Sequence, residues 1–136
     1  MRFDTKIVVV LRDDLALWQK LNVTAFLVSG IAATVVDVVG APYEDASGQQ
    51  YLPMFVQPVL VFSANAEQVR TAFGRAQAND IRCAIFSEEL FATGHDEANR
   101  TAVQAVTTDD LNLVGIAFRT DRKVADKIVK GLALHS

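Results

Sequence analysis

An unbroken apolar run near the start of the chain constrains its fold more than any other feature. Residues 6–11 read Lys-Ile-Val-Val-Val-Leu, and the run stops abruptly at Arg12. A second run at 111–118 ends in the same way, before a charged segment that begins at Thr120. Strands without polar alternation are covered on both faces, as in the centre of an α/β sheet. The sequence therefore predicts that both ends of the chain contribute strands to one sheet that lies between helices.

The segments between these two runs alternate between strand and helix patterns, which favours an α/β fold with largely parallel pairing. We expect strands at 6–12, 58–62, 81–86 and 111–118, and helices at 14–36, 65–78 and 121–132. Residues 90–106 fit either a turn or a short helix. Because the connection before the last strand lacks a clear helix pattern, both a parallel and an antiparallel direction of that strand are open. In the second helix we expect the sheet-facing residues to be Val69, Ala72, Phe73 and Ala76.

Two further local patterns concern the first helix and the segment that follows it. In the first helix Asp13 or Asp14 is the expected N-cap. Apolar residues recur there at helical spacing, namely Leu15, Trp18, Leu21, Ala25, Val28 and Ala32. Residues 40–51 are rich in turn formers and predict a loop or a small hairpin around Ser47-Gly48.

Size and composition bound the class of protein. The chain has 136 residues, and we expect one domain spanning 1–136. Its net charge of −3 disfavours binding to nucleic acid, which usually needs a basic surplus. No apolar stretch reaches membrane-spanning character, and the first residues lack the pattern of a secretory signal. With a single cysteine, Cys83, these features predict a cytoplasmic protein with an inert core thiol.

Several quoted segments resemble peptidyl-tRNA hydrolase type 2, the archaeal and eukaryotic kind. Residues 6–15 look like the opening strand of that family, and 115–128 look like its closing strand and helix. The segment Glu89-Leu-Phe-Ala-Thr93 lies where the family carries an acidic residue followed four positions later by threonine. Lys20 lies near the place of its lysine-bearing loop.

A closer likeness is to an uncharacterised bacterial group, the domain of unknown function family 2000. The segments that resemble this group are residues 17–25, 43–48 and 89–94. Together the two resemblances imply a three-layer α/β/α sandwich with a four-stranded mixed sheet, like peptidyl-tRNA hydrolase type 2. They also imply a homodimer.

Lys20, Glu89 and Thr93 are the candidate catalytic residues, chiefly because of the resemblance. If they converge at the strand ends, Lys20 can polarise a carbonyl, Glu89 can accept a proton and Thr93 can orient water or substrate. We therefore expect a hydrolase of a small amide- or ester-like substrate. The alternatives are a non-catalytic ligand-binding or regulatory module and, third, a true peptidyl-tRNA hydrolase. In the simplest structural interpretation Lys20 is a solvated helix residue, Glu89 a strand-end charge and Thr93 part of a turn.

Four more residues are candidates for binding a small-molecule ligand. Asn22 and Thr24 interrupt an otherwise apolar helix, where they either line a pocket or cap a neighbouring loop. Tyr43 and Asp45 flank a glycine turn, and either close over a ligand or simply form the turn.

Metal and cofactor sites are not expected. His95-Asp96-Glu97 are adjacent and point in different directions, whereas a zinc site needs three or four convergent ligands. No glycine-rich phosphate cradle follows the first strand, where Asp13 and Asp14 would repel a phosphate.

Overall fold

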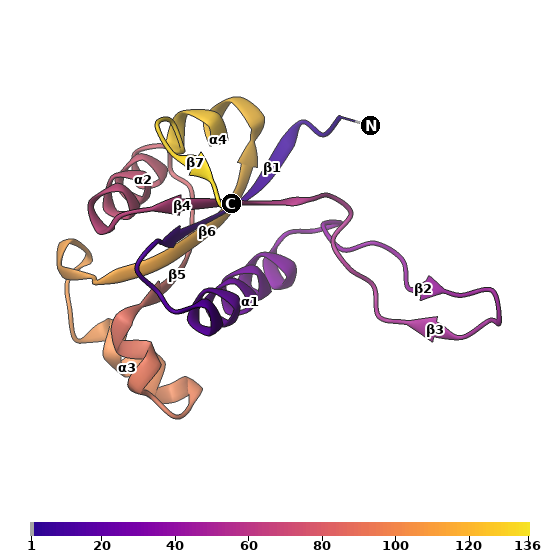
Figure 1. The fold of residues 1–136 in the computed structure, drawn as a ribbon, viewed down its shortest axis with the longest axis horizontal. Coiled ribbons are helices and arrows are strands. Elements are labelled where there is room, and N and C mark those ends of the chain that lie inside the picture. The colour runs from indigo at the N-terminus through magenta and orange to yellow at the C-terminus, as the bar shows by residue number, and fades with distance from the viewer. Residues whose placement is uncertain (1) are drawn as a thin grey trace.

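A mixed β-sheet with helices on both faces organises the chain (Figure 1). The computed structural model describes residues 2–136, and this part of the chain contains seven strands and four α-helices. In chain order they are β1 (Thr5–Arg12), α1 (Leu17–Thr34), β2 (Tyr43–Glu44), β3 (Gln50–Tyr51), β4 (Val59–Ala64), α2 (Ala66–Ala78), β5 (Ala84–Ser87), α3 (Asp96–Gln104), β6 (Leu113–Asp121), α4 (Arg122–Ile128) and β7 (Ala133–Leu134). Two short 3-10 helices, η1 (Glu88–Ala92) and η2 (Thr108–Asp110), flank α3.

The strands from the two ends of the chain lie side by side at the centre of the sheet. Its order is β5-β6-β1-β4-β7, in which β1 runs parallel to β4 and antiparallel to β6. The prediction that both terminal runs lie in one sheet is confirmed, and the open question about the last long strand is settled as antiparallel. The predicted largely parallel pairing is wrong, because β1 with β4 is the one parallel pair among the described strands. The prediction of four strands is wrong by one, because β7 also pairs with β4. A strand of two residues carries no periodicity from which it could be recognised.

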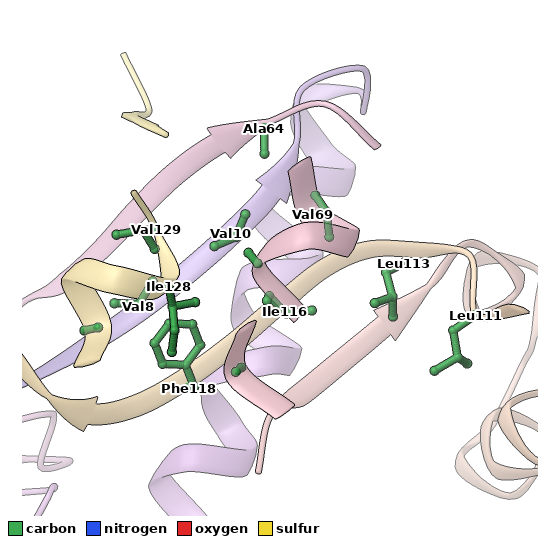
Figure 2. Packing of buried hydrophobic residues seen from close by; sticks show 13 residues of the cluster. Val8, Val10, Ala64, Val69, Leu111, Leu113, Ile116, Phe118, Ile128 and Val129 are labelled. Carbon is green, nitrogen blue, oxygen red and sulfur yellow. The ribbon is translucent and has the colours of Figure 1, made fainter. Parts of the chain in front are cut away.

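Both faces of the central strand are buried, as its unbroken apolar run predicts. Val8 and Val10 of β1 point toward α2 and α4, where they join Ile116 and Phe118 of β6 (Figure 2). The alternate residues of β1, Ile7, Val9 and Leu11, point toward α1 on the opposite face. The chain therefore has two hydrophobic layers, one on each side of a single sheet.

Helix α1 buries a different stripe from the one that its most regular apolar spacing indicates. Val23, Leu27 and Ile31 are its buried residues. Trp18 and Leu21 belong to the regular series, yet they are 62% and 66% exposed. An apolar pattern alone does not tell which of two stripes on one helix faces the sheet, because both satisfy helical spacing.

The N-cap expected at Asp13 or Asp14 is also wrong. The helix begins at Leu17, with Ala16 as its N-cap, and Gln19 Oε1 accepts a hydrogen bond from the Ala16 N–H at 2.9 Å. Asp14 instead accepts a hydrogen bond from Arg12 Nε at 2.6 Å.

The remaining helices follow the sequence more closely. Asn65 caps α2 by accepting a hydrogen bond from the Gln68 N–H at 2.8 Å. As predicted, Val69, Ala72 and Ala76 are buried, and Phe73 is half-buried. The ambiguous stretch 90–106 contains the end of η1 and the whole of α3. No described helix combines the length and the apolar character needed to cross a membrane.

An arm formed by residues 36–56 projects from the body of the molecule (Figure 1). At its root Val39 pairs with Phe55, and the Val56 N–H donates to the Val38 carbonyl at 3.0 Å. At its tip β2 and β3 form a hairpin whose turn includes Gly48 at φ +82°. The predicted small hairpin around Ser47-Gly48 is confirmed, and it forms the end of a longer two-stranded arm.

Cys83 precedes β5 and is half-buried, and its burial raises the pKa of the thiol to about 11. At pH 8 this leaves about 100-fold less thiolate than a thiol with a pKa of 9.0 would have. Because a more basic thiolate is also a better nucleophile, we expect alkylation by iodoacetamide to be at least ~10-fold slower in native protein than in urea. Equal rates in the two states, measured by mass spectrometry, would contradict this.

Candidate functional site

Four aromatic side chains form the wall of a cleft between α1 and the segment from η1 to α3. The rings of Trp18 and Phe91 lie 6.1 Å apart between centroids, and those of Phe86 and Phe91 lie 5.0 Å apart. Phe26 packs edge-on against Phe86, with centroids 6.0 Å apart. The cleft has a volume of about 290 Å³. Aromatic walls of this kind favour flat, partly apolar ligands.

Polar side chains face the same cleft from both of its sides. Asn22 comes from α1, whereas Thr93, His95, Asp96 and Asn99 come from the η1–α3 side, where the carboxylate of Asp96 pairs with Arg100. Thr93 Oγ1 lies 2.9 Å from the Leu90 carbonyl oxygen and also donates to Asn99 Oδ1. Because Asn99 Oδ1 is engaged in this way, its Nδ2 remains available to donate. Within residues 2–136 the Asn22 side chain makes no hydrogen bond.

His95 serves as the N-cap of α3, and this role fixes which of its nitrogens can donate. Its Nδ1 accepts a hydrogen bond from the Ala98 N–H at 3.2 Å. A neutral ring that accepts at Nδ1 carries its proton on Nε2. Together with the amides of Asn22 and Asn99, the cleft thus offers three donors beside an aromatic wall. Such a set suits a carbonyl or carboxylate oxygen.

The three candidate catalytic residues lie in different surroundings. Thr93 lines the cleft, whereas Glu89 lies exposed on η1 and outside the cleft lining. Lys20 also lies outside that lining, and its Nζ is 3.1 Å from Nε2 of His135. Each residue of an α-helix is rotated about 100° around the helix axis from the one before it. Lys20 and Asn22, two positions apart, therefore face nearly opposite sides of α1.

Among the four candidate binding residues, Asn22 alone lines this cleft. Thr24 Oγ1 donates to the Lys20 carbonyl at 2.8 Å, which ties it to its own helix. Tyr43 and Asp45 lie on the arm, which projects away from α3 in Figure 1 and contributes no residue to the cleft lining. The structure therefore brings Asn22 and Thr93 together, and it places Lys20, Thr24, Tyr43, Asp45 and Glu89 outside the cleft lining.

The polar tips of the strands form a separate cluster at the edge of the sheet. Arg12 Nη2 lies 3.6 Å from Glu88 Oε1, and Asn112 Nδ2 donates to Glu88 Oε2 at 2.7 Å. Arg12 Nη1 closes the triangle by donating to Asn112 Oδ1 at 3.3 Å. These groups use their hydrogen-bonding atoms on one another and so connect β1, η1 and the start of β6. Fewer of their donors and acceptors are therefore available to a ligand than in the cleft.

The carboxylate of Asp45 organises the hairpin turn. Its Oδ1 accepts from the Ser47 N–H at 2.9 Å and from the Gln49 N–H at 3.1 Å, and its Oδ2 accepts from the Tyr51 hydroxyl at 2.8 Å. The bond from Tyr51, followed by the two backbone bonds, lowers the pKa of Asp45. The same bond raises the pKa of Tyr51.

These shifts predict a hairpin that depends on pH at both extremes. A lowered pKa of Asp45 means that its contribution is complete above 3.8 and is lost as pH falls through the folded value. A raised pKa of Tyr51 means that its contribution is complete below 10.0 and is lost as pH rises through the folded value. We expect the amide protons of Ser47 and Gln49 to lose exchange protection in acid. The variant Asp45→Asn should show weakened protection already at neutral pH.

A larger groove, of about 520 Å³, runs over β4 on the α4 side of the sheet. Its apolar floor includes Leu60, Phe62 and Leu134. The polar groups at its rim are already engaged: Arg122 donates to the Phe3 carbonyl from Nε and Nη2, at 3.1 Å and 2.7 Å, and Lys6 pairs with Asp126 at 2.6 Å. This groove is larger than the aromatic cleft, but the cleft has more hydrogen-bond donors that are not already engaged. We take the cleft as the candidate binding site, because binding specificity depends on such donors more than on volume.

The aromatic wall was missed by reasoning from sequence, and so were His95 and Asn99 as cleft residues. Trp18 and Phe86 read as ordinary members of a helix and a strand, because their spacing carries no further signal. Within the described residues no three His, Cys, Asp or Glu side chains gather as a metal site would require.

The fold and the cleft together define an α/β protein with one mixed sheet and an aromatic-walled cleft between α1 and α3. The chain belongs to the family described as Protein of unknown function (DUF2000), whose model matches residues 5–136. It is similar to the solved structure of the protein of unknown function Atu0240 from Agrobacterium tumefaciens strain C58. The two are 50% identical, with a TM-score of 0.96 over 99% of this chain and 100% of the other. A search of curated proteins gives no match.

Proposed function

We propose that this protein binds a small, partly apolar molecule through a carbonyl or carboxylate oxygen in the cleft between α1 and α3. The observation that carries the proposal is the set of three available donors, Asn22 Nδ2, Asn99 Nδ2 and His95 Nε2, beside the aromatic wall. Aromatic contacts supply affinity, and the donors fix orientation. The volume of about 290 Å³ limits the ligand to a small molecule.

Trp18 provides a local reporter of binding, since it is the only tryptophan in the chain and lines the cleft. We expect saturable changes in its emission with N-acetyl-L-phenylalaninamide or N-acetyl-L-phenylalanine as probes. Loss of one hydrogen bond costs about 1 kcal/mol, so Asn22→Ala should weaken binding roughly 5-fold to 10-fold. Gln57→Ala, in the larger groove, serves as the matched control and should leave the affinity unchanged. A linear, non-saturating response to both probes would contradict the proposal.

Hydrolysis of a small amide- or ester-like substrate is the second candidate function. Thr93 favours it, because it lines the cleft, and Glu89 lies four residues before it on η1. In such a reaction Glu89 would accept a proton from water that Thr93 orients, and Lys20 would polarise the carbonyl. Lys20 would have to leave His135 and reach around α1 to do so, because it faces a different side of the helix from Asn22.

Turnover separates these two functions. Binding alone predicts that N-acetyl-L-phenylalanine p-nitroanilide and the corresponding ester are bound without release of product. Turnover that is lost in Glu89→Gln, with the fold intact, would establish the hydrolase instead. Thr24→Ala is a suitable control, because Thr24 bonds only within its own helix.

The resemblance to peptidyl-tRNA hydrolase type 2 supports a third and weaker candidate. The net charge of −3 gives little attraction for tRNA. Release of tRNA from N-acetyl-aminoacyl-tRNA, abolished by Lys20→Ala, would displace both of the functions proposed above.

A further inference from the structure

The exposed apolar side chains of this protein gather in two places. Of the twelve large hydrophobic residues that are exposed within residues 2–136, ten belong to α1 or to the arm. Phe26 of α1 lines the cleft, and the other nine are Leu17, Trp18, Leu21, Val36, Tyr43, Tyr51, Leu52, Met54 and Val56. Leu52 is 85% exposed and Leu17 is 70% exposed. Apolar patches of this extent on a water-soluble surface mark interaction sites.

The outer side of α1 carries an exposed apolar stripe beside the polar residues Asn22 and Ser29. Leu17, Trp18 and Leu21 are exposed on it, together with Ala25 and Ala32. The only charged residue of this 18-residue helix is Lys20, which is half-buried and bonded to His135. An apolar stripe on the exposed side of a helix is normally covered by another element or a partner. The regular stripe seen in the sequence is thus available for a second contact.

The arm also exposes apolar side chains that no other described segment covers. Beyond its root, β2 and β3 pack mainly on each other (Figure 1). A single two-stranded hairpin is marginally stable in water, and this one carries Leu52 and Met54 exposed beside it. Its Tyr and Met side chains, like Trp18 on α1, are residue types that interface cores favour.

We propose that the arm and the outer side of α1 form a homodimer interface, in which the arm of each copy lies along α1 of the other. The arm continues past the carboxyl end of α1 (Figure 1), so a two-fold axis near that end carries each arm back along the partner's helix. The nine side chains leave on the order of 100 Å² open each, or roughly 900 Å² per copy, close to the ~800 Å² per partner of a stable interface.

The occupant is a second copy because both complementary parts lie on the same chain. An interface with two-fold symmetry uses the same surface twice, so one arm and one helix per chain suffice to cover both apolar surfaces. A different partner would need two complementary surfaces of its own, whereas this chain already carries both.

The test begins with the molecular mass in solution. By light scattering at micromolar concentration we expect twice the 14.8 kDa mass of the chain. Leu21→Glu on the helix and Leu52→Asp on the arm should each give monomers that keep the far-UV circular dichroism of the wild type. Val106→Asp, at an exposed apolar residue outside both surfaces, is the matched control and should leave the dimer intact.

Cross-linking then tests the exchange of arms. In a Cys83→Ser background, one chain carries Ala25→Cys and another carries Leu52→Cys. After mixing, a short bifunctional maleimide should join these two chains to each other. A monomer at high micromolar concentration overturns the proposal. So does a dimer that survives both charge substitutions, or one in which helix and arm of different chains do not cross-link.

Discussion

Replacing Gly115 with valine is expected to lower the free energy of unfolding by about 3 kcal/mol. Gly115 lies in β6, and a Cβ atom there would come within 2.9 Å of Val23 Cγ1 and 3.1 Å of Leu27 Cδ1. Val23 and Leu27 are the buried residues through which α1 packs on the sheet. Since both side chains are buried against the sheet, the overpacking is relieved by displacing them or α1 from a closely packed layer.

The variant Gly115→Ala should show the same effect in smaller size, about 1–2 kcal/mol. Gly74→Ala is the matched control, because a Cβ atom at Gly74 meets nothing within 4 Å and Gly74 lies within α2. We expect this control to stabilise the protein by roughly 0.5–1 kcal/mol, so the two substitutions should have opposite signs. Urea unfolding at one fixed protein concentration measures both. An unchanged midpoint in Gly115→Val would show that α1 does not pack closely on β6.

The second large effect is expected in the opposite layer of the core. Phe118 of β6 is 1% exposed and packs among Val8, Ile128 and Val129 (Figure 2). Truncating such a side chain leaves a cavity, and Phe118→Ala should cost about 3–5 kcal/mol. For a domain of this size that corresponds to a fall in Tm of roughly 10–20 °C.

Phe26→Ala is the control for Phe118→Ala, since Phe26 is 56% exposed at the cleft. It loses contact with Phe86 but leaves no buried cavity, so we expect a cost of about 1 kcal/mol. Calorimetry of the two variants at equal concentration compares them directly. Equal losses of stability would mean that the layer beneath α2 and α4 contributes no more than the cleft.

The central part of the fold could be predicted because its sequence signal is local. Residues 7–11 and 113–118 are uninterrupted apolar runs, and such runs predict strands that are buried on both faces. By contrast, β7 is too short to show a pattern. The buried stripe of α1 was ambiguous because the helix carries two apolar stripes, and only the position of the sheet decides between them.

The cleft could be predicted only in part, for a related reason. Asn22 and Thr93 each stood out, one as a polar residue within an apolar helix and the other through a family resemblance. Their neighbours Asn99 and Phe86 did not, because the cleft forms between segments about 70 residues apart in the chain. Lys20 was expected at the same site through the family resemblance, yet it lies two positions from Asn22 on α1 and faces a different direction.

The measurement that tests this account most directly is a titration of isotope-labelled protein with N-acetyl-L-phenylalaninamide, followed by two-dimensional NMR. The side-chain amide signals of Asn22 and Asn99 and the indole signal of Trp18 report on the cleft, and that of Gln57 reports on the larger groove. We predict saturable shifts at the first three with a single affinity, and none at Gln57. Shifts confined to Gln57 and its neighbours in the larger groove would contradict the assignment of the cleft as the binding site.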